Sequence, residues 1–186
     1  MNDRIAKITG EIDAIAQDAA TTFGGLGRDQ LNWKPATKSW SVAQCIDHLM
    51  TINSMYFPLF ERMRSNDMSN TFWERYSPLS GFFGRYLIKT LSPEYPKKMK
   101  TTRKAYPSAS DLDGTIISQF GEHQRQLGEH IRQISPEVDL QKTIITSPLL
   151  GFVTYSLDDT LTILTVHERR HLLQARRVME TDGFSD

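Results

Sequence analysis

The chain has 186 residues, of which 39% are hydrophobic and 24% charged, so it is long enough to bury a core as a single globular domain over residues 1–186. Lysine plus arginine and aspartate plus glutamate both number 22, and this balance argues against a nucleic-acid-binding protein, which usually carries excess positive charge. The start of the chain lacks the apolar stretch of a signal peptide, and no apolar run is long enough to span a bilayer, so we expect a cytoplasmic protein with no membrane partner.

The first two predicted helices are separated by a glycine-rich stretch. One runs from about residue 2 to residue 22, because apolar residues recur there at three- and four-residue steps and share one helical face: Ile5, Ile8, Ile12, Ile15 and Ala19. The next begins near Ser41, since Ser41 and Gln44 have the spacing of a capping box, and Pro58 predicts a kink toward its end. Its apolar side carries Cys45, Leu49, Ile52, Met55, Tyr56 and Leu59.

A long connection follows, from residue 65 to about residue 107. Prolines interrupt it, and only residues 82–91 have a weak helical pattern. A connection of this length inside a compact domain is usually a functional cover or a crossover. Its basic residues indicate either an anion-binding patch or a solvated loop, and the zero net charge favours the loop: Lys97, Lys98, Lys100, Arg103 and Lys104.

Two further helices complete the pattern. The third is predicted over residues 110–134, and a short extended piece follows near residues 143–146. The fourth begins at Ser156, where Ser156 and Asp159 indicate a second capping box, and it continues to about Val178. Nothing alternates with the helices as buried strands would, so we expect an all-α four-helix bundle with a long irregular connection between helices two and three.

His167 and His171 are four residues apart on the predicted fourth helix, so both imidazoles leave the same face one turn apart. That face is apolar, and the arginines of the helix are expected on the opposite side: Arg169, Arg170, Arg176 and Arg177. His48 lies at the edge of the apolar stripe of the second helix. Buried imidazoles need a hydrogen-bond partner or a metal ion, and the pattern alone leaves both interpretations open.

Several stretches of the sequence resemble DinB/YfiT-like proteins. The resemblance covers the entry to the second helix, the middle connection and the last helix, and so nearly the whole chain: residues 31–35 (LNWKP), 39–44 (SWSVAQ), 47–49 (DHL), 82–85 (FFGR), 97–100 (KKMK) and 157–178, which contain HERRHLLQ. It implies a four-helix bundle that binds a divalent metal ion, zinc or nickel, through His48, His167 and His171. It also implies a possible homodimer.

Members of this family with known activities include thiol-dependent transferases and isomerases that use low-molecular-weight thiols such as bacillithiol or mycothiol. The resemblance therefore implies a metal-dependent enzyme, a thiol S-transferase or a hydrolase, that acts on a small-molecule substrate. An ion with an open coordination position would lower the pKa of a bound thiol or water and create a nucleophile. The alternatives are a metal- or small-ligand-sensing bundle without turnover, and a degenerate bundle without metal.

Two residues near the predicted cluster are candidates for a role in catalysis. Glu168 is a candidate proton carrier or hydrogen-bond acceptor for a histidine, although an ion pair with a basic residue on another element is the commoner fate of such a side chain. Gln174 is a candidate to bond a ligand or a metal-bound water, with an interhelical hydrogen bond as the alternative. Asp47 points about 100° away from His48, so we expect it to orient something else.

Other residues have ordinary structural interpretations beside the functional ones. Cys45, the only cysteine, is either a fourth metal ligand or a small core residue, and the resemblance favours the core, since the position is usually apolar in the family. His123 and His130 match no ligand position of the family and are not assigned to the site. We expect Trp33 and Trp40 to pack a loop against the bundle, with Trp40 also in the pocket wall.

Overall fold

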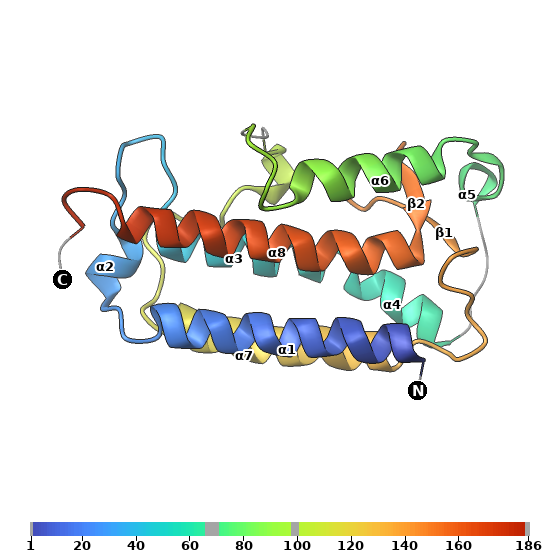
Figure 1. Ribbon diagram of the computed structural model, residues 1–186, viewed down its shortest axis with the longest axis horizontal. Helices are drawn as coiled ribbons and strands as arrows, with labels where there is room; N and C mark the ends of the chain where they lie inside the picture. Colours follow the sequence, from blue (N-terminus) through green and yellow to red (C-terminus); the bar gives the residue numbers. More distant parts are fainter. Residues whose placement is uncertain (1, 66–70, 98–100, 185–186) are drawn as a thin grey trace.

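The computed structural model describes residues 2–65, 71–97 and 101–184, without the side chain of Arg103. Four long helices form a bundle: α1 (Asp3–Phe23), α3 (Val42–Ser54), α7 (Ile116–Arg132) and α8 (Leu157–Met179). Figure 1 shows α1 and α8 running in one direction and α3 and α7 in the other. Because α1 and α3 each pack against both α7 and α8, α1 lies diagonally across from α3. The predicted four-helix bundle is confirmed.

Shorter elements connect the long helices. They are α2 (Arg28–Asn32), α4 (Phe57–Arg64), α5 (Phe72–Tyr76), α6 (Ser80–Leu91), a 3-10 turn η1 (Arg103–Ala105), and the strands β1 (Ile144–Thr146) and β2 (Thr154–Ser156). The strands form an antiparallel hairpin in which Ile145 pairs with Tyr155, so the extended piece predicted near residues 143–146 is confirmed. The helix α2 was not predicted.

The second and third helices differ from their predicted boundaries. The chain turns at Met55 and Tyr56, and Pro58 lies in the first turn of α4, where its missing N–H costs nothing. The third helix begins at Ile116 rather than near residue 110. The reason is tertiary: Asn32 accepts a bond from the Leu112 N–H and donates one to the Leu112 carbonyl, which holds this segment against α2 in a non-helical form.

The connection between α4 and α7 contains more helix than its sequence pattern predicts. Within it, α6 is a helix of 12 residues that packs on α8 and on β2 (Figure 1). A close approach allows this packing, because Gly84 of α6 lies directly against the carboxylate of Asp159 and any β-carbon there would clash with it. The connection therefore forms an outer layer over one side of α8, as expected of a cover.

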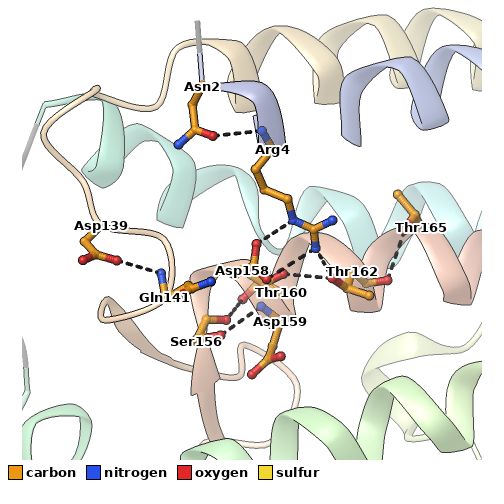
Figure 2. A network of polar contacts seen from close by, with 10 residues as sticks. All are labelled: Asn2, Arg4, Asp139, Gln141, Ser156, Asp158, Asp159, Thr160, Thr162 and Thr165. Atoms are coloured by element: carbon orange, nitrogen blue, oxygen red, sulfur yellow. Dashed lines mark hydrogen bonds and ion pairs between the residues drawn. The ribbon is translucent and has the colours of Figure 1, made fainter. Parts of the chain in front are cut away.

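The start of α8 is anchored from two sides (Figure 2). The Ser156 hydroxyl accepts a hydrogen bond from the Asp159 N–H at 3.0 Å, which caps the helix as predicted. The reciprocal half of the predicted capping box is replaced by the contact of Asp159 with Gly84. From α1, the Arg4 guanidinium bonds Asp158 at 2.6 Å and Thr162 at 2.5 Å. These contacts fix the first turn of α8 relative to α1.

Two apolar clusters fill the bundle, and a polar layer separates them. Along α8, the residues Leu157, Leu161 and Leu164 belong to one cluster, and Leu172, Ala175 and Val178 belong to the other. Between them, buried polar side chains from three helices meet: Asn53, Gln124 and Glu168. A third, smaller cluster lies between α6, the hairpin and Ile163. The polar layer thus occurs at the level of α8 where the histidines are found.

Candidate metal centre

Three histidines from two helices converge beside the polar layer. His167 and His171 come from α8 and His48 from α3, and each offers a ring nitrogen that lies within 4.8 Å of the others. All three side chains are buried. The structure therefore brings together the three residues that the sequence analysis singled out, and among the described residues this is the only group of its kind.

The ring of His48 has a fixed tautomer. Its Nδ1–H donates to the carbonyl oxygen of Ala105 in η1 at 2.5 Å, which leaves the lone pair of Nε2 directed inward. That Nε2 lies 3.3 Å from Nε2 of His167. Two imidazole nitrogens at this separation share either a proton or a metal ion, and ligands bound about 2.1 Å from a tetrahedral ion lie about 3.4 Å apart. The spacing therefore fits a shared ion.

The environment keeps the imidazoles neutral. Burial lowers the pKa of all three rings, and for His167 burial together with repulsion from His48 and Arg170 lowers the pKa to about 3. The bond to Ala105 opposes this effect at His48, and the Gln174 side chain opposes it at His171. Neutral imidazole is the form that binds metal ions, so no proton has to be displaced from the cluster near neutral pH.

The segment that carries the Ala105 carbonyl is tied to α3 at three places. Besides the His48 bond, Gln44 donates to the Ala109 carbonyl at 3.0 Å. Asp47 accepts bonds from Ser108, at 2.5 Å from the backbone N–H and 3.1 Å from the hydroxyl. As expected, Asp47 orients something other than His48. The role of the Ala105 carbonyl could not be predicted from the sequence, because every residue supplies a backbone carbonyl.

A pocket of about 1230 Å³ opens on the histidine cluster. Trp40 forms part of its wall and stacks on His171, with ring centroids 5.7 Å apart, whereas Trp33 is partly buried and packs against the core. Gln174 also lines the pocket, beside His171. The opposite wall comes from α6, from residues 93–96 and from Thr101, Thr102, Ala105 and Tyr106, so the predicted cover by the long connection is confirmed.

The arginines of α8 do not all lie away from the histidines, and the prediction that they would is wrong. Arg170 lines the pocket and donates from both Nη atoms to carbonyl oxygens of the cover, those of Ser92 at 2.8 Å, Tyr95 at 3.0 Å and Lys97 at 2.8 Å. Arg177 also lines the pocket. Both lie only about 100–120° around the helix from His171, near enough for a long side chain to reach the pocket.

Arg169 and Arg176 face α1 instead. Arg169 pairs with Glu11 at 3.3 Å, and Arg176 pairs with Asp18. The four arginines therefore divide between two neighbours of α8, the bundle helix on one side and the pocket cover on the other.

Glu168 points into the polar layer rather than into the pocket. One carboxylate oxygen accepts hydrogen bonds from the amides of Asn53 and Gln124, each at 2.6 Å. Burial raises its pKa to about 7, and the two amide bonds oppose that rise. The expected ion pair is therefore wrong: the partners of Glu168 are uncharged amides, and sequence analysis missed both of them because they lie on other helices.

The remaining candidates lie outside the cluster. Cys45 is a fully buried core residue whose pKa is raised to about 12 by burial, so its thiol is inert. His123 stacks on Phe57, and His130 contacts Phe57 and pairs with Glu61.

The basic residues of the long connection are placed only in part. Lys97 and Lys104 are exposed and do not line the pocket, as the solvated-loop interpretation predicts. Lys98, Lys100 and the side chain of Arg103 lie outside the described residues.

Comparison with known proteins gives matches of two kinds. The sequence profile described as the DinB superfamily matches residues 11–175. Among solved structures, the chain is similar to YfiT from Bacillus subtilis, described as a probable metal-dependent hydrolase with an unusual four-helix bundle topology. The two are 13% identical, with a TM-score of 0.64 over 100% of this chain and 91% of YfiT, which is a likeness of fold. No curated protein matches the chain.

Within the described residues, no helix is long and apolar enough to cross a membrane.

Proposed function

Because the chain belongs to the DinB superfamily, we propose that it is a divalent-metal-dependent enzyme whose ion is held by His48, His167 and His171. The observation that carries the proposal is the convergence of three buried, neutral imidazoles within 4.8 Å of one another at the wall of a large pocket. Zinc and nickel both accept three imidazole ligands.

The donor set suits a catalytic ion better than a structural one. Structural zinc sites are closed by four protein ligands, whereas catalytic sites keep a position open toward substrate. Among the described residues no fourth His, Cys, Asp or Glu joins the cluster, and the inert Cys45 thiol is not part of it. A divalent ion bound there would lower the pKa of a water or thiol in the open position toward neutrality.

The residues around the cluster have defined tasks in this proposal. The Ala105 carbonyl holds the His48 ring with Nε2 inward, and Trp40 covers the outer face of His171. Gln174 lies at the pocket wall, where its amide is placed to orient a bound substrate. Glu168 is bonded to two amides in the core, so it supports α8 from behind and is not the proton carrier.

We place the reaction in one of two classes, hydrolysis or transfer to a low-molecular-weight thiol. The description of YfiT as a probable metal-dependent hydrolase supports the first, and the resemblance of the sequence to thiol-dependent family members supports the second. In both, the histidine cluster would hold the ion that activates the nucleophile, and the pocket would hold the small-molecule substrate.

Metal analysis of untagged protein tests the central claim. We expect about one equivalent of zinc or nickel in the native chain and a loss of metal affinity of at least about tenfold in His171→Ala and His48→Ala. The matched control is His123→Ala, which removes a histidine outside the cluster and should leave the metal content unchanged. Native protein without stoichiometric metal would contradict the proposal.

The reaction class is tested with metal-loaded protein against ester, amide and thiol-conjugation substrates. We expect turnover of one class that chelation abolishes and that His171→Ala lacks. A protein that binds metal stoichiometrically but turns over neither class, with no exchangeable water on the ion, would instead be a metal or small-ligand sensor.

A further inference from the structure

The pocket is elongated, and the histidine cluster lies along its length rather than at its end. Its lining residues on α8 begin at Ile163 and continue to Val178, with Thr181 just beyond. At about 1.5 Å per helical residue, the stretch from Ile163 to Val178 alone is about 22 Å long. His167 and His171 lie between its two ends, so a ligand that fills the groove must pass the cluster.

One end of the groove is apolar. Its walls are leucine and isoleucine side chains from α6, α8 and the hairpin turn: Leu87, Leu149, Leu150, Ile163 and Leu164. Buried Tyr56 and Tyr155 also line it, and their hydroxyls bond each other at 2.7 Å. Burial raises the pKa of both phenols, so this end carries no charge. It suits an aliphatic or aromatic group.

The other end is open and basic. Lys38, on the loop before α3, and Arg177, near the end of α8, both line it and are exposed. Figure 1 shows that loop and the end of α8 on the same side of the molecule. Neither cation bonds a carboxylate within the described residues, whereas Arg170 is already occupied by carbonyl oxygens of the cover. The one acidic lining residue, Glu94, lies on the cover and accepts a bond from the Ser92 hydroxyl.

From this polarity we propose that the substrate is an elongated carboxylate with an apolar tail, bound with the tail toward Tyr56 and Tyr155 and the anion between Lys38 and Arg177. That this ligand is a substrate rests on the proposed function, whereas its binding rests on the pocket alone. Arg177 is about eight residues along α8 from the centre of the cluster, which corresponds to about 12 Å. The bond that reacts therefore lies about that far from the carboxylate.

Decanoate and its neutral isostere decanamide are the probes, and calorimetric binding to the full chain after chelation is the measurement. Lys38→Glu/Arg177→Glu reverses the two pocket charges, and Lys7→Glu/Lys89→Glu makes the same charge change at exposed lysines outside the pocket. We expect the first pair to weaken decanoate about tenfold and the control pair to leave it within about twofold. Decanamide should bind all three proteins alike.

Two results would overturn the inference. One is decanoate affinity that is unchanged in Lys38→Glu/Arg177→Glu or that falls equally for decanamide, since neither pattern reflects charge recognition. The other is decanoate binding that appears only in metal-loaded protein, because the carboxylate would then bind the ion. Because the test uses chelated protein, its outcome is independent of the metal analysis that tests the proposed function.

Discussion

At the scale of single residues, the polar layer through the bundle is held by one carboxyl group. Glu168 accepts from Asn53 of α3 and from Gln124 of α7, so it links three helices at the level of the histidine cluster. Its second oxygen and the amide oxygens of both partners have no hydrogen-bond partner among the described residues. Buried amide donors without an acceptor lower the stability of the fold, so the two hydrogen bonds to Glu168 stabilise this layer.

We predict that Glu168→Leu lowers the free energy of unfolding by about 2–4 kcal/mol, because it leaves two buried amide donors without an acceptor. Glu168→Gln keeps a carbonyl oxygen in the same place and should stay within about 1 kcal/mol of the native protein. Urea unfolding of chelated protein at pH 6 measures both. Equal stability of the Leu variant and the native chain would show that the layer contributes nothing.

The sequence predicts which side chains of a helix point inward. It does not predict their hydrogen-bond partners on other elements. The inward positions of His48, His167 and His171 followed from helical periodicity, and their convergence was implied by the family resemblance. The Ala105 carbonyl left no signal, because backbone groups are the same in every residue. The partners of Glu168 are likewise set by tertiary packing, so helix periodicity could not supply them.

At the scale of elements, one side chain of α8, that of Arg170, makes several hydrogen bonds to residues 92–97 of the cover. The planar guanidinium of Arg170 reaches three carbonyl oxygens of residues 92–97 at once. A lysine at this position would keep the charge but present donors from one point rather than from a rigid fork. Arg170 therefore holds the cover by geometry as well as by charge.

Arg170→Lys should loosen this part of the cover without unfolding the bundle. We expect backbone amide hydrogen exchange in peptides over residues 92–97 to become about tenfold faster, since local opening loses bonds to a charged donor. Exchange in α1 should not change. Arg169→Lys is the control, because Arg169 pairs with Glu11 on α1 rather than with the cover. Similar exchange in both variants would show that other contacts hold the segment.

The boundaries of a helix were predicted well where an apolar face repeats over many residues. They were predicted poorly where hydrogen bonds to a distant part of the chain decide where the helix begins. The helices α1 and α8 begin and end within a few residues of expectation, since each has a long apolar face and a capping residue. The late start of α7 depends on the Asn32 bonds to Leu112, which no local pattern contains. The same holds for α6, whose stability comes from packing on α8 and β2.

At the scale of the whole molecule, exposed large apolar side chains gather on α5, at the start and along the length of α6, and on the hairpin turn, and we call them the apolar patch. Its residues are each 46–77% exposed: Phe72, Trp73, Tyr76, Leu79, Phe82, Tyr86 and Phe152. A hydrogen bond of 3.0 Å from the Trp73 indole to the Phe152 carbonyl joins its two halves. The patch exposes on the order of 800 Å² of side-chain surface, which matches what each partner buries in a standard interface.

We propose that a second copy of the chain covers this patch, which would give the homodimer that the family resemblance implies. Sedimentation equilibrium at tens of micromolar should show twice the chain mass for the native protein and the single chain mass for Phe82→Glu/Phe152→Glu. Tyr106→Glu replaces an exposed aromatic outside the patch and should remain dimeric. A native chain that sediments at its single mass would refute the proposal.

The junction between β2 and α8 limits where the chain can gain or lose residues. The strand ends at Ser156 and the helix begins at Leu157, with no residue between them, and the strand register is fixed by the pair Ile145–Tyr155. A residue inserted at this junction would turn every later side chain of α8 by about 100° and remove both helix histidines from the pocket. A residue inserted in the turn at 148–152 would lengthen only the hairpin. Related chains are therefore expected to vary in length on one side of the strand and to keep an invariant count from Tyr155 to His171 on the other.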